Sequence, residues 1–165
     1  MIISKYSLRI KCLVFMVLAF PLFTSHILEL SMSLELCNLC YYQRYLYYIA
    51  TAIAFIFFFI KNTAKIIVIT MIIFFIASLG LSFYHVGIEN GFFELPSECV
   101  SNFDSYKMSI EEILNKIKEN VPCDEVNFTI LMLSLAEWNF IYSFVCIVLL
   151  IILLNKINVS SKKEV

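Results

Sequence analysis

The stretch IIVITMIIFFIASLGLSFYHVGI, residues 66–88, decides the fold class because it contains no Asp, Glu, Lys or Arg. A helix that crosses a membrane needs about 20 predominantly apolar residues, and it satisfies its backbone polar groups internally. The whole chain shares this character, with 61% hydrophobic and only 15% charged residues over 165 positions. That composition excludes a soluble globular enzyme. A net charge of −1 argues against a nucleic-acid partner.

Three more apolar stretches flank this segment. They cover about 8–28, 41–60 and 128–154, and Glu137 alone interrupts the last one. The runs are continuously apolar instead of alternating, which favours helices over barrel strands. The sequence therefore predicts an all-α membrane protein, a four-transmembrane-helix bundle in which the whole chain forms a single integral membrane domain.

The first two spans each depend on a further interpretation. A basic start before an apolar run also fits a cleavable signal peptide, but no small-x-small cleavage site follows Phe23, so we prefer an uncleaved span. The second span reaches full length only if it begins near Tyr41 and the Arg44 guanidinium extends to the headgroups. Arg44 is therefore expected at the membrane interface.

Lysine and arginine residues predict the orientation, because they favour the cytoplasmic side of a membrane. Eight of the 12 lie before or at the very start of the first span, between the second and third spans, or after the last. The other four share the remaining two loops with most of the acidic residues. Both termini are therefore expected in the cytoplasm, with outward loops at about 29–44 and 89–127.

The second outward loop contains a one-sided helical pattern. Its apolar residues recur at three-and-four spacing, at Ile110, Ile113, Leu114, Ile117 and Val121, and charged residues fill the other face. We expect a short interfacial amphipathic helix, with its apolar face on the membrane surface or against a partner protein.

The six cysteines divide by predicted side of the membrane. Cys12 and Cys146 lie inside spans and are expected to be packing residues. The other four lie on the outward loops, at Cys37, Cys40, Cys99 and Cys123. Disulfides persist in oxidising compartments and not in the cytosol, so these four are candidates for disulfide chemistry.

Cys37 and Cys40 form a CxxC at the start of the second span. This spacing is typical of a pair that is readily reduced and reoxidised. Haem attachment requires His after the second cysteine, where Tyr41 stands. Zinc would need a second close ligand pair, which Cys99 and Cys123 do not provide. A static disulfide remains as an alternative.

Three polar residues near the spans could serve a redox site. Arg44 lies one helical turn beyond Cys40, and its cation and the helix N-terminus would both stabilise a thiolate. Its alternative role is interfacial anchoring. His85 ends the third span and could donate a hydrogen bond to a carbonyl acceptor, although a simple interfacial histidine is equally compatible. Glu137 is either an intramembrane functional carboxylate or, as we favour, a residue near the outer interface.

Cys99 and Cys123 flank the amphipathic segment. They could form a structural loop disulfide. Alternatively, they could pass electrons by thiol–disulfide exchange to the CxxC, so that one pair collects electrons and the other delivers them.

Taken together, these motifs resemble the disulfide bond formation protein B (DsbB) family of quinone-reducing membrane oxidoreductases. The resemblance covers most of the chain and rests on CNLCYYQR at 37–44, YHVGIENG at 84–91 running on to Pro96 and Cys99, PCDE at 122–125, and LSLAEWN at 133–139.

The resemblance implies a multi-pass protein of the bacterial cell inner membrane that oxidises a periplasmic thioredoxin-like thiol oxidase of the DsbA type. Cys99 and Cys123 would take the electrons, with Cys99 forming the mixed disulfide.

Cys37 and Cys40 would then pass the electrons to ubiquinone or menaquinone in the lipid bilayer. Cys40 would contact the quinone, Arg44 would position it, and His85 would contribute to its pocket. No metal is expected.

The chain departs from the family pattern at three positions. Leu36 stands where many relatives have proline, and Met132 and Glu137 replace glycines expected in shorter relatives. These changes concern local packing more than chemistry. The rival functions are a non-enzymatic membrane scaffold with a structural loop disulfide and a vitamin-K-epoxide-reductase-like quinone reductase.

Overall fold

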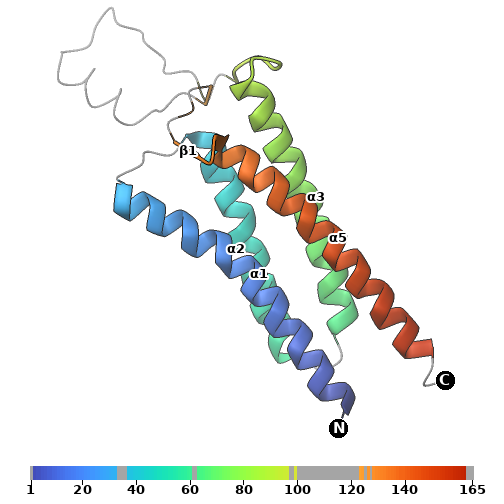
Figure 1. Cartoon of the computed structure of the whole chain (residues 1–165). Helices are drawn as coiled ribbons and strands as arrows, with labels where there is room; N and C mark the ends of the chain where they lie inside the picture. Colours follow the sequence, from blue (N-terminus) through green and yellow to red (C-terminus); the bar gives the residue numbers. More distant parts are fainter. Residues whose placement is uncertain are drawn as a thin grey trace, which may run out of the picture.

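The computed structural model describes residues 2–32, 37–60, 63–96, 99, 123–124, 126 and 128–162. Within these ranges the chain is mostly helical (Figure 1). The helices are α1 (Ile2–Met32), α2 (Asn38–Phe59), α3 (Ala64–Glu89) and α5 (Leu135–Lys162). A short antiparallel hairpin, β1 (Thr129–Ile130) and β2 (Leu133–Ser134), precedes α5.

Three helices are long and apolar enough to cross a membrane, over Leu8–Ser31, Ala64–Glu89 and Leu135–Val159. This confirms a helical membrane protein. The helix α2 is not among the three, because its first turns carry the polar run Tyr41-Tyr42-Gln43-Arg44. Its crossing therefore stays a prediction. The amphipathic helix expected around residues 110–121 lies outside the described residues.

The last helix begins later than the sequence predicted. Residues 129–134 form the hairpin instead of helix, and α5 begins at Leu135, not at 128. The turn residues Leu131 and Met132 both have positive φ, of 53° and 68°, as a two-residue type I′ turn requires. The prediction overlooked this turn because the segment is apolar throughout.

A capping box explains why α5 begins where it does. The Ser134 backbone N–H donates to Glu137 Oε2 at 2.7 Å, and the Glu137 N–H donates to Ser134 Oγ at 3.1 Å. The Ser-x-x-Glu pattern satisfies two backbone donors that a helix start would otherwise leave unpaired. Glu137 is thus a capping residue in the first turn of α5, and its interfacial position stays a prediction.

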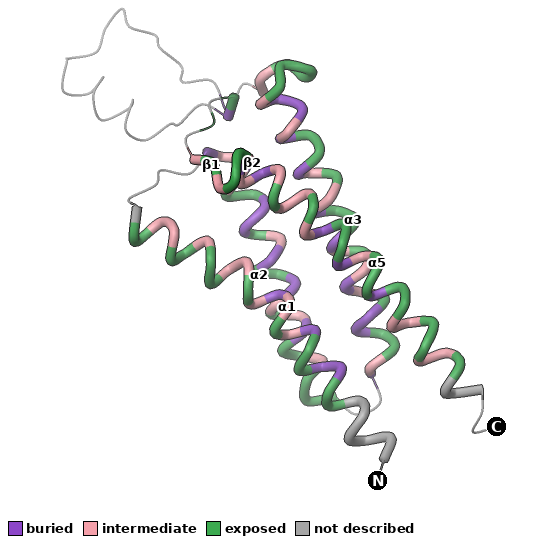
Figure 2. Tube along the Cα trace, in the orientation of Figure 1, coloured by how far each residue is buried: buried purple, intermediate pink, exposed green. Residues whose placement is uncertain are grey.

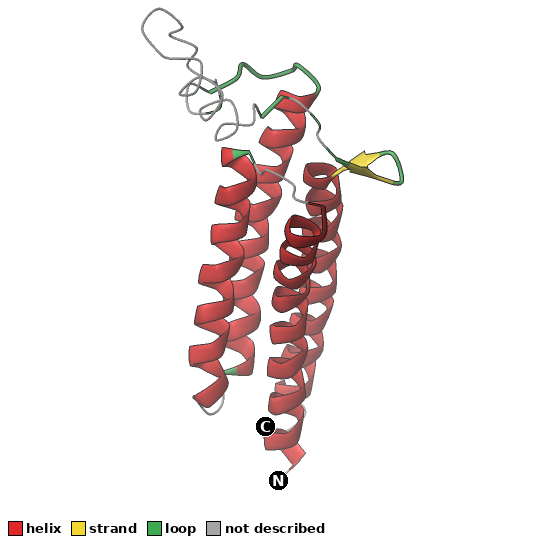
Figure 3. Ribbon diagram, turned by 90° about the vertical axis from the view of Figure 1, so that its left-hand side faces the viewer, coloured by secondary structure: helices red, strands yellow, loops and turns green. Residues whose placement is uncertain are grey.

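The closest packing is between α3 and α5 and between α1 and α2. In Figure 3, α1 and α5 lie on the side of the hairpin, and α2 and α3 lie on the other side. The start of α1 and the end of α5 lie at one end of the bundle, and the hairpin lies at the other (Figure 1). The core includes Val14 and Leu18 of α1, Ala50 of α2, Phe75 of α3 and Leu150 of α5. Many large apolar side chains are exposed, as a lipid-facing bundle requires. Figure 2 shows exposed residues along all four helices.

A proline in the middle of α1 shapes the outer half of the bundle. Pro21 has no N–H, so the carbonyl of Val17, four residues earlier, loses its helical donor. The Tyr142 hydroxyl of α5 donates to this carbonyl at 2.6 Å instead. Beyond this point α1 leans away from the rest of the bundle (Figure 1), which leaves space between α1, α2 and α5.

The outer end of α3 turns the chain back toward α2. The N–H groups of Phe92 and Phe93 both donate to the Gly87 carbonyl, at 2.7 and 3.2 Å. A side chain at position 87 would begin 2.1 Å from the Phe93 ring, so only glycine fits there. Gly91 has a φ of +71°, which glycine adopts without strain.

Candidate active site

The CxxC forms the first turn of α2. Cys37 is the N-cap residue, and its sulfur accepts a hydrogen bond from the Cys40 N–H with N and S 3.3 Å apart. The two sulfur atoms are 2.9 Å apart. Both cysteines are thiols. The positive end of the helix dipole therefore acts directly on Cys37.

Cys37 has a second polar neighbour on α3. The imidazole Nε2 of His85 lies 3.5 Å from the Cys37 sulfur, and Glu89, one turn further along α3, lies 3.8 Å from the same nitrogen. The hydrogen bond from the Cys40 thiol and the nearby His85 outweigh burial and lower the pKa of Cys37 to about 5. Cys37 is therefore the thiolate of the pair.

The cation that the sequence assigned to thiolate stabilisation lies elsewhere. Arg44 Nη1 donates to Glu29 Oε2 at 2.6 Å, and Nη2 donates to Ser25 Oγ at 2.7 Å, both on α1. Its guanidinium carbon lies 5.9 Å from the centre of the Tyr41 ring. Glu29 thus balances its charge, and it does not contribute to the lowered pKa of Cys37.

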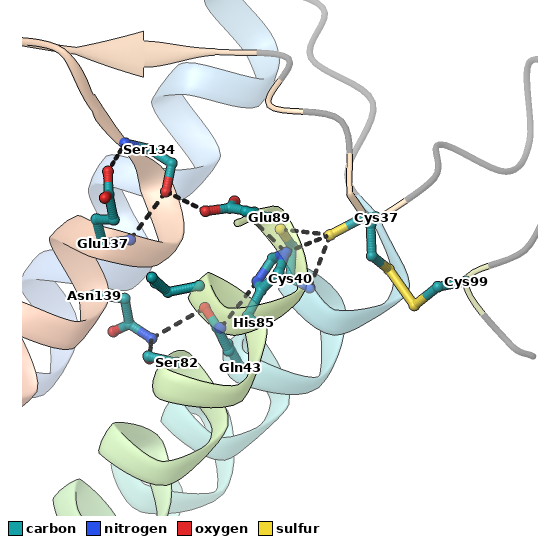
Figure 4. A network of polar contacts seen from close by, with 12 residues as sticks. Cys37, Cys40, Gln43, Ser82, His85, Glu89, Cys99, Ser134, Glu137 and Asn139 are labelled. Atoms are coloured by element: carbon teal, nitrogen blue, oxygen red, sulfur yellow. Dashed lines mark hydrogen bonds and ion pairs between the residues drawn. A yellow bond between two sulfur atoms is a disulfide. The ribbon is translucent and has the colours of Figure 1, made fainter. Parts of the chain in front are cut away.

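The other two outward cysteines are joined as a disulfide, Cys99–Cys123, with Cα atoms 5.4 Å apart. The sequence analysis allowed a bond between these two cysteines, and the structure has it. The disulfide is buried with Cys37, Leu39 and Ile88 in one small cluster at the outer end of the bundle. Figure 4 shows Cys99 beside the Cys37–Cys40 turn. The structure thus brings both cysteine pairs together.

A cavity of about 270 Å³ lies on the other side of Cys40, where α1 leans away beyond Pro21. This volume is near the lower end of the range for small-molecule sites, about 300 to 1,000 Å³. Cys40 and Arg44 line the cavity, whereas Cys37 and His85 do not. Its walls are mainly apolar, with Leu28, Ile130, Leu135, Trp138 and Tyr142 among them.

One buried polar atom in this wall has no partner. Arg44 is 9% exposed, and its Nε is the one buried side-chain nitrogen or oxygen of the described residues without a hydrogen bond. A buried N–H without an acceptor costs roughly 1–3 kcal/mol. An acceptor atom that reached this N–H would remove that cost.

A polar network between the helices connects the cavity to His85 (Figure 4). Asn139 of α5 contacts Gln43 of α2 at 3.0 Å and Ser82 of α3 at 2.7 Å, and Gln43 contacts His85 Nδ1 at 3.2 Å. The sequence analysis did not assign roles to these residues. Polar side chains within apolar spans were the available signal, because such residues are costly in a membrane without a function or a partner.

His85 is therefore placed differently from its predicted role. It lies beside Cys37 and is 2% exposed, away from the walls of the cavity. Cys37, Cys40 and His85 have potential ligand atoms within 4.8 Å of one another, which could hold a metal ion. A structural zinc site takes four ligands, and the described part of the chain adds no fourth residue to this group.

Comparison with known proteins identifies the family. A family model described as disulfide bond formation protein DsbB matches residues 8–153. No curated protein and no solved structure matches the chain. The matched segment reaches into all four described helices and includes both outward cysteine pairs. The protein therefore belongs to the DsbB family of membrane disulfide bond formation proteins.

Proposed function

We propose that the protein is a quinone-dependent protein-disulfide oxidoreductase of the bacterial inner membrane, with both termini in the cytoplasm. It reoxidises a periplasmic thioredoxin-like thiol oxidase of the DsbA type and transfers two electrons to ubiquinone or menaquinone. One observation carries the proposal: Cys40 is in contact with Cys37 and, together with Arg44, lines a cavity, and the buried Nε of Arg44 has no hydrogen-bond partner.

The electrons enter at the loop disulfide. A thiolate of the reduced partner attacks the Cys99–Cys123 disulfide and forms a mixed disulfide, and the partner's second thiol displaces it. The partner leaves as a disulfide, and Cys99 and Cys123 become thiols. They then reduce a Cys37–Cys40 disulfide by the same exchange and become a disulfide again. Burial of both pairs in one cluster supports this step.

The electrons leave at the CxxC. Oxidation of the Cys37 and Cys40 thiols to a disulfide releases two electrons and two protons, which convert a quinone to a quinol. A bonded loop pair beside a CxxC dithiol, as the structure has them, corresponds to the state immediately before this step.

The residues of the cavity would hold the quinone ring. Arg44 Nε would donate to a carbonyl oxygen, while Glu29 and Ser25 fix the guanidinium in place. The apolar wall from α1 and α5 would exclude water. The cavity lies beside the first turn of α2, close to the outer end of the bundle, which suits an acceptor that arrives through the lipid.

The test is turnover with purified protein, a reduced DsbA-type oxidase and a water-soluble ubiquinone analogue, followed by quinone absorbance. Cys40→Ser should abolish turnover. Cys12→Ser is the matched control, because Cys12 is exposed on α1 and should leave the rate unchanged. Absence of turnover by the unmodified protein would favour the scaffold, and unchanged turnover in Cys40→Ser would refute the proposal.

A second variant distinguishes the roles of the two cysteine pairs. Cys99→Ser should block oxidation of the protein partner but preserve quinone reduction by a small dithiol such as dithiothreitol, which can reach the CxxC directly. Normal turnover of the partner in this variant would exclude the two-pair relay and favour a vitamin-K-epoxide-reductase-like mechanism.

A further inference from the structure

The hydrogen bond of Ser82 sets the direction of the polar network beside the CxxC. The Ser82 hydroxyl lies 2.8 Å from the Ser78 backbone carbonyl, which can only accept. Ser82 therefore donates its single hydrogen there. The side chain of Asn139, 2.7 Å from the Ser82 oxygen, must then donate to it, so its NH₂ group faces Ser82.

The orientation of the Asn139 amide fixes the orientation of the Gln43 amide. The same NH₂ group of Asn139 lies 3.0 Å from the side chain of Gln43. Only the Gln43 carbonyl oxygen can accept there, so the Gln43 NH₂ points the other way, to His85 Nδ1 at 3.2 Å. A reversed Gln43 would set two NH₂ groups against each other. Nδ1 of His85 is consequently an acceptor.

We infer that Gln43 and Asn139 are positioning residues that hold His85 in the tautomer with its proton on Nε2, directed at the Cys37 sulfur. An imidazole whose Nδ1 accepts a hydrogen bond carries its proton on Nε2. This nitrogen lies 3.5 Å from the Cys37 sulfur, within hydrogen-bond range for sulfur, and 3.8 Å from Glu89, beyond that range for oxygen.

The tautomer decides whether His85 favours or opposes a thiolate. The titratable groups that face Cys37 are Cys40 on its own helix and His85 and Glu89 on α3. With the proton on Nε2, His85 donates to the thiolate. In the other tautomer a lone pair would face the sulfur, and Glu89 would add a second repulsion. The chosen tautomer also directs an N–H, not a lone pair, at the two sulfurs, which opposes metal binding.

The role of this His85 tautomer in the reaction rests on the proposed function. A thiolate at Cys37 favours the reduced CxxC and so favours electron uptake from the loop pair. The tautomer of His85 can be tested without quinone or partner. The chain has only two histidines, so ¹⁵N-histidine labelling gives two pairs of ring-nitrogen signals, and His26→Gln assigns them. The reduced protein in detergent should show His85 with Nε2 protonated and Nδ1 unprotonated. The opposite pattern would overturn the inference.

Asn139→Asp tests the origin of the tautomer. A carboxylate cannot donate, so Gln43 should turn its NH₂ toward position 139 and its oxygen toward His85, which moves the proton to Nδ1. Loss of one charge-assisted hydrogen bond should raise the midpoint of Cys37 alkylation by about one to two pH units. The new charge alone would also raise this midpoint, so the nitrogen pattern is the deciding readout.

Tyr47→Phe is the matched control. The Tyr47 hydroxyl donates to Asn139 Oδ1 at 2.7 Å, but Ser82, not Tyr47, sets the direction. The control should lose one hydrogen bond to the same Asn139 and keep the Nε2–H pattern. An Asn139→Asp protein that retains this pattern would refute the role of the network. If Asn139→Asp does not fold, the pattern in the unmodified protein still decides the tautomer.

Discussion

Replacing Arg44 by Lys should weaken quinone binding without slowing the chemical step. The guanidinium uses Nη1 for Glu29, at 2.6 Å, and Nη2 for Ser25, at 2.7 Å, and leaves Nε without a partner. A lysine ammonium is a single point of charge and cannot reproduce this planar fork. Once it bonds to Glu29, no donor remains at the position of Nε.

The size of the effect follows from the one hydrogen bond that is lost. A hydrogen bond to a charged group contributes about 1.5–3 kcal/mol. Because each 1.4 kcal/mol is about a factor of ten, the KM for quinone should rise about 10- to 150-fold. The kcat should change little, because the bond to the carbonyl is made on binding and the reacting sulfur belongs to Cys40.

The assay is the initial rate of quinone reduction over a range of quinone concentrations, with dithiothreitol as the donor. Glu29→Gln is the matched control, since its carbonyl oxygen can still accept from Nη1, and it should change KM by less than about threefold. An unchanged KM in Arg44→Lys would refute a hydrogen bond from Arg44 Nε to the quinone. It would favour the alternative role of Arg44 as an interfacial anchor. A reduced kcat with an unchanged KM would also contradict it.

Three further measurements test separate parts of the structure. The rate of iodoacetamide alkylation of Cys37 in the reduced protein should reach half its maximum near pH 5, because the pKa of Cys37 is lowered from 9.0 to about 5. Met132→Gly should stabilise the fold by about 0.5–1 kcal/mol in chemical unfolding, since Met132 is 96% exposed and has a φ of 68°. Glu137→Ala should destabilise it by about 1 kcal/mol in the same assay, because the Ser134 N–H loses its acceptor.

Each of these expectations has its own control. The denatured protein should show a Cys37 alkylation midpoint near 9.0, and a midpoint near that value in the folded protein would contradict the lowered pKa. Because the pKa falls on folding, the stability that the thiolate gives to the reduced protein is complete above pH 9.0 and is lost as the pH falls to about 5. Leu133→Gly, next to Met132 but in the strand, should destabilise the hairpin. Glu137→Gln should retain most of the cap, since Gln also accepts.

Hydropathy was sufficient to predict the membrane class and the position of α3, because a long run without charge has few alternatives. It failed at the start of α5 for a physical reason. The hairpin residues Thr129 to Leu133 are as apolar as the helix that follows, so hydropathy does not distinguish them. The local signal was the Ser134-Leu135-Ala136-Glu137 capping box, which specifies a helix start independently of hydropathy.

The structure gives a physical account of one departure from the family pattern, at Met132. Glycine was expected at this position, and the structure gives the residue a positive φ, which glycine adopts at little cost. The other two departures from the family pattern are at Glu137 and Leu36. Glu137 supplies half of the capping box, and Leu36 lies outside the described residues.

At the site, sequence reasoning identified the four outward cysteines but not the arrangement of their neighbours. Helical spacing places Arg44 near Cys40, yet it does not reveal that Glu29 on another helix binds the guanidinium. Likewise, no spacing within α3 indicates that His85 meets Cys37. Contacts between helices depend on packing and on the Pro21 bend, and neither is encoded in a local pattern.

The position of the CxxC at a helix start explains how two cysteines in contact can have different neighbours. Cys37 is the N-cap, and Cys40 lies in the first helical turn, so their sulfurs are close enough to join while the residues occupy different surroundings. Cys37 is next to His85 and the loop disulfide, and Cys40 borders the cavity behind Pro21. In the proposed relay, exchange between them would carry electrons from the disulfide side to the cavity side. A CxxC in the middle of a helix would lose the backbone N–H donated to Cys37, and with it part of the stabilisation of the thiolate.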